Sequence, residues 1–118
     1  MKVVPSYLDA VGNAVPSGRN GNATDFETVA ASQTAQALGD TGAVGDFLAR
    51  LVIIPATTSP GTVVLLDDET SVTIFAGGAS SVASLAPIIV EMGITSAEGA
   101  WGVTTGSNVS VVAVGAFT

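Results

Sequence analysis

The sequence of 118 residues contains no cysteine and no histidine. Without cysteine there are no thiolate nucleophiles, disulfides or cysteine-ligated metal centres. Without histidine, Ser-His-Asp triads and histidine-ligated zinc are excluded as well. The aromatic supply is also small, with one Trp, one Tyr and four Phe. These absences remove most of the side chains on which catalysis and metal binding rely, and we predict no cofactor and no enzymatic activity.

Positive charge is equally scarce. Lys2, Arg19 and Arg50 stand against ten acidic residues, which gives a formal net charge of -7. Three basic side chains cannot neutralise a run of phosphates, and this excludes a nucleic-acid-binding surface. Charged residues make up only 11% of the chain, against about 25% in ordinary soluble domains, while apolar residues make up 47%. This balance is typical of a surface that other chains largely cover.

Long hydrophobic runs are missing too. A run such as Leu51–Ile54 is far shorter than the ~20 residues of a membrane helix. Lys2 is followed by only two apolar residues before Pro5, and Asp9 interrupts the next stretch. The sequence therefore predicts neither a signal peptide nor a membrane partner.

From Asp25 onward the sequence predicts β structure, and its length allows a single domain. Val, Ile, Thr and Phe cluster in short runs separated by Gly, Pro, Asp and Ser, which is the pattern of strands and turns. The predicted strands lie near residues 26–32, 34–38, 46–54, 61–67, 71–76, 86–92, 100–105 and 108–117. About eight short strands indicate an all-β fold, a single β-sandwich with the jelly roll as one of its arrangements.

Local sequence details predict particular turns and a pattern of burial. Ser59-Pro60-Gly61 places Pro second and Gly third, as a type II turn requires. Asp67–Thr70 predicts a tight polar hairpin, and Gly106–Asn108 predicts a turn into the last strand. The continuous apolar runs Leu51–Ile54 and Val63–Leu66 predict strands that are covered on both faces.

Residues 1–24 differ in composition and predict an N-terminal arm and linker ahead of a β-sandwich domain at residues 25–118. Residues 17–22 have the Gly-, Ser- and Asn-rich composition of a linker. The arm nevertheless carries six apolar side chains: Val3, Val4, Tyr7, Leu8, Val11 and Val15. Two interpretations remain open, a frayed terminus or an extended arm that docks on a neighbour. Because so apolar a tail would otherwise be exposed, we favour the docking arm and assign these six residues to partner binding.

Two glycine-containing motifs suggest chemistry but depart from its requirements. Asp40-Thr41-Gly42-Ala43 resembles the active-site triplet of retroviral-type aspartic proteases, in which two carboxylates share a proton. In that family an apolar pair precedes the Asp, whereas Leu38-Gly39 precedes Asp40 here. The wider segment 39–46 is similar to a phosphate-binding loop, yet it has no Lys and carries two aspartates that repel phosphate. We interpret both motifs as one Gly-rich loop.

Two binding hypotheses rest on acidic and aromatic residues. Asp67, Asp68 and Glu69 offer carboxylate oxygens to Ca²⁺, but their spacing matches no EF-hand loop. A solvated hairpin tip is the alternative for this triplet. Trp101 is either a core residue of its strand or a platform for a sugar ring. Because sugar-binding surfaces generally use several exposed aromatic residues, the sequence favours a core Trp101.

The β domain carries few charges and is rich in Ala, Val, Thr and Gly, and its residues 53–61, 75–81 and 99–106 are similar to segments of other proteins. These segments resemble small virion structural proteins of tailed bacteriophages, in particular capsid decoration (cement) proteins, and the resemblance extends over residues 29–118. It implies a non-enzymatic homotrimer on the capsid surface of the virion that bridges capsomers of the major capsid protein. It also implies synthesis in the host cytoplasm. The alternative is a receptor- or carbohydrate-binding β-sandwich module of a phage fibre, which would need exposed Trp or Tyr.

Overall fold

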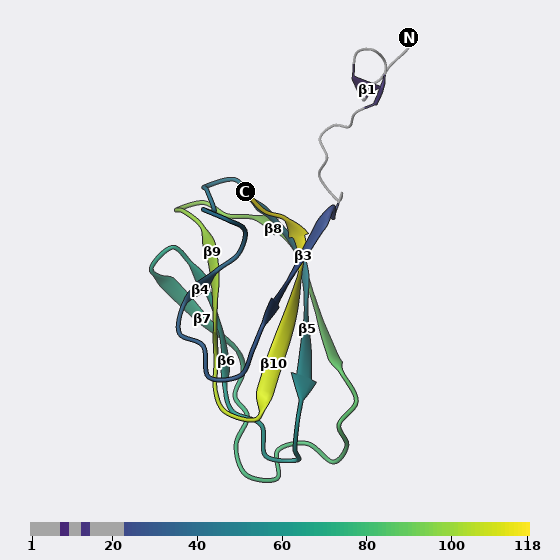
Figure 1. The fold of residues 1–118 in the computed structure, drawn as a ribbon, viewed down its shortest axis with the longest axis vertical. Helices are drawn as coiled ribbons and strands as arrows, with labels where there is room; N and C mark the ends of the chain where they lie inside the picture. Colours follow the sequence, from purple (N-terminus) through teal and green to yellow (C-terminus); the bar gives the residue numbers. More distant parts are fainter. Residues whose placement is uncertain (1–7, 10–12, 15–22) are drawn as a thin grey trace.

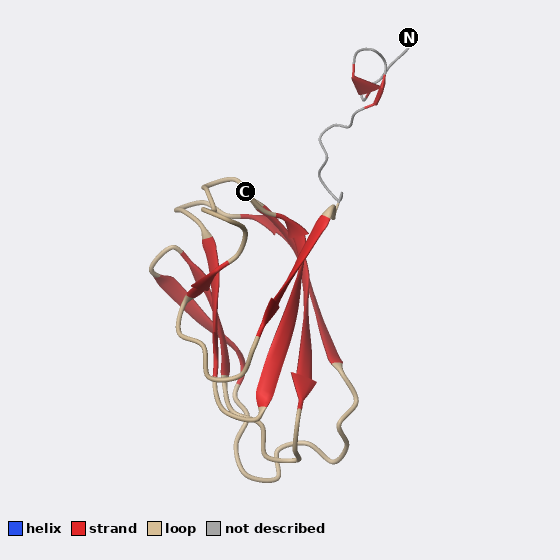
Figure 2. Cartoon of the chain, in the orientation of Figure 1, coloured by secondary structure: helices blue, strands red, loops and turns tan. Residues whose placement is uncertain are grey.

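The computed structural model describes residues 8–9, 13–14 and 23–118, which form strands, turns and loops (Figures 1 and 2). The strands are β1 Leu8–Asp9, β2 Asn13–Ala14, β3 Asp25–Val29, β4 Gln36–Ala37, β5 Phe47–Pro55, β6 Val63–Asp67, β7 Thr70–Phe75, β8 Ile88–Thr95, β9 Trp101–Thr105 and β10 Val109–Ala116. Each of the eight strands predicted from residue 26 onward is confirmed, as β3 to β10. Within the described residues, no helix is long and apolar enough to cross a membrane.

Strands β3 to β10 form two four-stranded antiparallel sheets that face each other (Figure 2). One sheet has the order β3-β10-β5-β8 and is named here the β10 sheet; the other has the order β4-β9-β6-β7 and is named the β9 sheet. The pairs are nested, because β3 pairs with β10, β4 with β9, β5 with β8 and β6 with β7. A nested ribbon rolled into two sheets is the jelly-roll arrangement of a β-sandwich.

The core lies between the two sheets and follows the two-residue period of the strands. Along β10, every second residue from Val109 to Gly115 is buried, and its neighbours are half-buried. The buried apolar side chains are Val29, Leu38, Leu48, Ala49, Leu51, Ile53, Val63, Leu65, Trp101, Val103, Val109, Val111 and Ala113. Trp101 is only 4% exposed, and its indole N–H donates to the main-chain oxygen of Asp46 at 2.9 Å. The prediction of a core Trp101 is confirmed.

The predicted burial of both faces of the apolar runs is wrong. Leu51 and Ile53 are fully buried, but Val52 and Ile54 are only half-buried. Val64 and Leu66 likewise point away from the core and are half-buried. The physical reason is that each sheet of a two-layer sandwich has a partner on one side only.

Two of the three turns predicted from the sequence are confirmed. Asp68-Glu69 joins β6 to β7 as a hairpin in which Asp68 has φ of 58°, and Asn108 has φ of 62° where the chain enters β10. The type II turn at Ser59–Gly61 is wrong, because Gly61 does not have the positive φ that this turn needs. Gly61 is instead pressed against Gly106: a Cβ on Gly61 would lie 2.8 Å from the Gly106 Cα.

Within the N-terminal arm, the described backbone forms a short antiparallel ladder. Leu8 of β1 is paired with Ala14 of β2, and Asp9 is paired with Asn13. The other predicted partner-binding residues, Val3, Val4, Tyr7, Val11 and Val15, lie outside the described residues.

Candidate docking surface

The outward face of the β10 sheet carries a row of side chains that crosses all four strands and is apolar on β10, β5 and β8. Thr28, Val112, Val52 and Ile89 are successive partners in the ladders β3·β10, β10·β5 and β5·β8. Paired residues in adjacent strands point to the same side of a sheet, so this row is continuous. Ile89 is 61% exposed, while Val52 and Val112 are half-buried.

A second row runs parallel to the first and contains the charges of this face. Phe26, Val114, Arg50 and Glu91 are again successive partners across the sheet. Phe26 is 72% exposed. The Arg50 guanidinium forms an ion pair with Glu91, with Nε 3.2 Å from Oε2. The two charges of the face therefore cancel each other.

We name this surface the docking face and define it by its two charged and six apolar side chains. It consists of Phe26, Arg50, Val52, Ile54, Ile89, Glu91, Val112 and Val114. The outward face of the β9 sheet differs, because Ser71, Thr73 and Thr104 there lie beside Val64 and Leu66. Among the described residues, the apolar outward surface is thus concentrated on one sheet.

A second apolar surface lies at one side edge of the sandwich, between β7 and β8. A cavity of about 230 Å³ opens there, and we name it the edge groove. Its apolar lining comes from Leu65, Val72, Met92, Ile94 and Trp101. Val72 is 54% exposed and Ile94 is 43% exposed, although each pairs with an inward-facing residue of the neighbouring strand. Asp67 and Thr70 complete the rim of the groove.

The acidic hairpin beside the groove has a structural task. Both carboxylate oxygens of Asp67 accept main-chain N–H groups, from Ala97 at 2.9 Å, Glu98 at 3.1 Å and Gly99 at 3.2 Å. These hydrogen bonds, that from Ala97 above all, hold the pKa of Asp67 below its ordinary value of 3.8. Within the described residues, no group of three acidic side chains is placed to hold a metal ion. The geometry therefore gives the Ca²⁺ hypothesis for Asp67, Asp68 and Glu69 no support.

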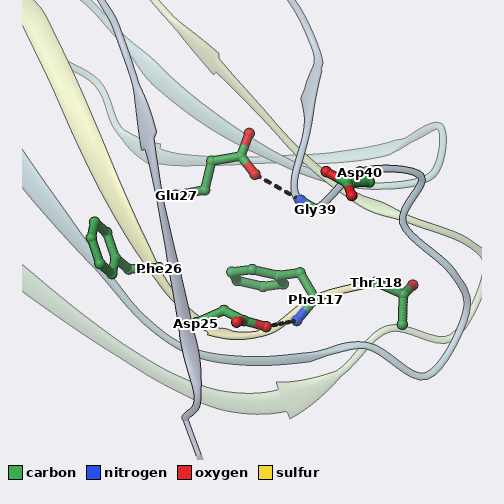
Figure 3. Close-up of a pocket in the computed structure, with 7 residues that line it drawn as sticks. All are labelled: Asp25, Phe26, Glu27, Gly39, Asp40, Phe117 and Thr118. Carbon is green, nitrogen blue, oxygen red and sulfur yellow. Dashed lines mark hydrogen bonds between the residues drawn. The ribbon is translucent and has the colours of Figure 1, made fainter.

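A polar cavity of about 240 Å³ lies at the start of β3 (Figure 3). Its carboxylates hold neighbouring chain segments: Asp25 accepts the Phe117 main-chain N–H at 3.1 Å, and Glu27 accepts that of Gly39 at 2.7 Å. Figure 3 shows the ring of Phe26 on the side of β3 opposite to the side chains of Asp25 and Glu27. On that side Phe26 belongs to the docking face. These hydrogen bonds hold the start of β3, where the N-terminal arm joins the sandwich, against the neighbouring segments.

The Asp-Thr-Gly motif lies in the loop between β4 and β5. Asp40 is exposed, and Gly42 has φ of 70°, as a turn residue in a Gly-rich loop can adopt. The buried acid of this loop is Asp46, whose Oδ2 accepts the main-chain N–H groups of Ala43 at 3.1 Å and Thr118 at 3.0 Å. The Asp46 carboxylate therefore ties the loop between β4 and β5 to Thr118.

Sequence reasoning missed the docking face and the edge groove. The sequence did carry a signal for the docking face. In β5 and β10 the residues that face the core are apolar, and so are Val52, Ile54, Val112 and Val114 at the positions between them. Phe26 and Ile89 carry no such signal, because their orientation depends on the register between strands. The edge groove depends on the strand order of both sheets, which makes β7 and β8 the edge strands on the same side of the sandwich.

Comparison with protein-family models, curated proteins and solved structures finds no significant match for this chain.

Proposed function

We propose that this protein is a non-enzymatic virion component that decorates and stabilises an icosahedral phage capsid by bridging capsomers of the major capsid protein. The observation that carries the proposal is the docking face, on which Phe26 and Ile89 are widely exposed beside half-buried apolar side chains and the two charges form an ion pair. Apolar patches of this kind are often sites of contact with another macromolecule.

The charge distribution favours a protein partner that meets this one face. Residues 25–118 carry one basic residue, Arg50, against nine acidic ones, which leaves a net charge of -8 on the domain. The docking face contributes nothing to that excess, because Arg50 and Glu91 are paired within it. An apolar patch on a capsid shell can therefore approach here without meeting unpaired charge, while other surfaces of the domain remain acidic and solvated.

The resemblance of residues 29–118 to phage decoration proteins supplies the identity of the partner, and the fold is compatible with it. Jelly rolls occur in viral capsid proteins and also in lectins. Because a fold alone does not determine function, this likeness has less weight than the docking face.

The size of the docking face favours binding by several linked copies, and the resemblance to decoration proteins implies three. Four strands at about 4.8 Å spacing and a length of about 26 Å cover roughly 500 Å², less than the ~800 Å² per partner of a stable interface. One copy alone would therefore bind weakly. Three linked copies would bind through three faces at once and gain affinity from their high effective concentration.

The alternative, a carbohydrate-binding module of a phage fibre, gains no support from the site. Trp101 is buried and its indole N–H is already paired, so it offers no platform for a sugar ring. Among the described aromatic side chains, Phe26 is the one that is widely exposed. No second function is proposed.

The first prediction tests the docking face on shells of the parent virus. Ile89→Asp places a charge at the β8 end of the apolar row, and loss of one buried Ile side chain is worth about 1.5–3 kcal/mol. We expect the affinity for shells to fall at least about tenfold, measured by co-sedimentation of the purified chain.

Val44→Asp is the matched control, because Val44 is also 61% exposed but lies in the loop before β5. This variant should bind shells as the unaltered chain does. Equal loss of binding in both variants, or no loss in either, would show that the docking face is not the contact surface.

A further inference from the structure

The start of β3, where the N-terminal arm joins the sandwich, and the edge groove lie on opposite sides of the sandwich. The arm joins the chain at β3, and β3 and β4 are the edge strands on one side. On this side a hydrogen bond links the two sheets, because the side-chain amide of Gln36 in β4 donates to the carboxylate of Glu27 in β3 at 2.8 Å. The edge groove opens on the other side, between edge strands β7 and β8.

The edge groove has the character of a binding site for an apolar segment of chain. Its lining is apolar, and Val72 and Ile94 remain half exposed within it. Among the described strands, β7 and β8 each pair on one side only. An edge strand beside an apolar groove offers both main-chain hydrogen bonds and side-chain pockets to an added segment.

The arm suits this groove in apolarity, and its charge does not oppose binding. It carries the six apolar residues named above, and residues 1–16 hold Lys2 against Asp9 and so have no net charge, while Arg19 in the linker brings residues 1–24 to +1. The surroundings of the groove are acidic, with Asp67 on its rim and Glu98 bonded to Thr70 at 2.7 Å. A neutral, apolar segment that is followed by a basic linker therefore meets no repulsion at this edge of a domain that carries -8.

We propose that the edge groove binds residues 1–16 of a second copy of this chain. When two copies stand side by side in the same orientation, the β3 side of one faces the β8 side of the next. The arm then leaves its own domain directly at its neighbour's groove. Residues 17–24 span up to about 26 Å when extended, which is sufficient for this step.

The arm's own groove lies three strand spacings away across the β10 sheet, or about 14 Å from β3. Residues 17–24 can span that distance too, so the dilution experiment below decides between the chain's own groove and a neighbour's. The contact between copies is of the head-to-tail kind, in which unlike surfaces meet. Such contacts close into rings when the rotation between copies allows it, and a trimer is the smallest ring. The inference rests on the self-association that the proposed function includes, and it names the surfaces involved.

The second prediction uses the absence of cysteine from this chain. Two singly substituted full-length proteins, Leu8→Cys in the arm and Thr70→Cys on the groove rim, are mixed and treated with a short bismaleimide. We expect a cross-linked pair that contains one chain of each kind. Val44→Cys replaces Thr70→Cys in the control mixture, and its yield should be several-fold lower. Equal yields in the two mixtures would overturn the proposal.

A chain that carries both Leu8→Cys and Thr70→Cys distinguishes a neighbour's arm from the chain's own. Dilution should abolish cross-linking if the arm belongs to a second copy. Cross-linking that persists within single chains at high dilution would overturn the proposal in favour of self-docking.

A further measurement with the same purpose is the oligomeric state of Val72→Asp, determined by sedimentation equilibrium. The added charge should reduce self-association, whereas Leu85→Asp, at an apolar position that is 50% exposed outside the groove, should leave it unchanged. Identical association of both variants and the unaltered chain would contradict the proposal. No shells are present in these experiments, so their failure is distinct from a failure of shell binding by Ile89→Asp.

Discussion

At the scale of single residues, Asp67 shows how one carboxylate can organise a loop. Its two oxygens accept three successive main-chain N–H groups from residues 97–99. The segment before β9 is thereby tied to the end of β6, which fixes the acidic rim of the edge groove. The sequence indicated a polar hairpin at this position, but the N–H donors come from thirty residues further along the chain. No pattern in the sequence around Asp67 predicts that these N–H groups are its partners.

The third prediction concerns the pH dependence that follows from Asp67. Because its pKa is lower in the folded chain than the ordinary value of 3.8, the ionised carboxylate stabilises the fold above that pH. The stabilisation is lost as the pH falls through the folded pKa. Asp67→Asn should lower Tm at neutral pH and should reduce the fall in Tm on acidification to about pH 2.

Glu69→Gln is the control, since it removes a charge from the same hairpin and leaves the three hydrogen bonds in place. Thermal unfolding followed by circular dichroism over a pH series compares the two. Superimposable curves for both variants would mean that the hydrogen bonds of Asp67 do not stabilise the fold.

At the scale of elements, glycines determine how closely two turns approach at one end of the sandwich. Gly61 and Gly106 are in mutual contact, and the Gly61 N–H donates to the Ser107 main-chain oxygen at 2.8 Å. A Cβ on Gly77 would lie 2.5 Å from the main-chain oxygens of Pro60 and Gly61. Main-chain atoms cannot move aside as a flexible side chain can. The Pro-Gly pair before β6 therefore serves close packing and not a type II turn.

The fourth prediction tests this close approach. In Gly61→Ala the new methyl group would lie 2.8 Å from the Gly106 Cα, and overpacking of this kind costs about 1–3 kcal/mol. We expect Tm to fall by roughly 4–12 °C. Gly102→Ala, whose Cβ would lie 3.5 Å from the Gln36 main-chain oxygen in ordinary contact, should change Tm much less. Similar shifts in the two variants would contradict the close-packing argument.

The strands themselves were within reach of sequence reasoning, while their partners were not. Runs such as those of β5 and β10 combine β-branched residues with turn signals at both ends, and these local features are sufficient to locate a strand. The pairing of β10 with both β3 and β5 depends on contacts between distant segments. For the same reason the sequence placed Val52 inside the protein, although it faces outward from its sheet.

At the scale of the whole molecule, residues 23–118 have a core of their own between the two sheets. Every buried apolar side chain among the described residues lies between Val29 and Ala113. The carboxylates of Asp25 and Glu27 already fasten the start of β3 to the segments at Phe117 and Gly39. The stability of a single copy should therefore reside in residues 25–118, and the contribution of the arm should appear only between copies.

The fifth prediction follows from this division. Deleting residues 1–16 should change the Tm of dilute protein by no more than about 2 °C, because changes outside a core alter stability by about 0.5 kcal/mol or less. The same deletion should reduce both self-association and retention on shells. Thermal melting and co-sedimentation measure the two effects. A large fall in Tm at dilution would place the arm in the core of its own domain, and unchanged retention would remove its role in assembly.

The nested strand order also determines when the protein can fold. Val29 pairs with Val111 and Asp25 with Gly115, while β10 also pairs with β5. During translation the β10 sheet therefore lacks one of its two inner strands until β10 has left the ribosome. Synthesis of a chain of this length takes on the order of ten seconds. Until β10 has been made, the apolar strands β5 and β6 have no completed core to enter, so each new chain passes through a period of exposure to chaperones and to aggregation before the sandwich can form.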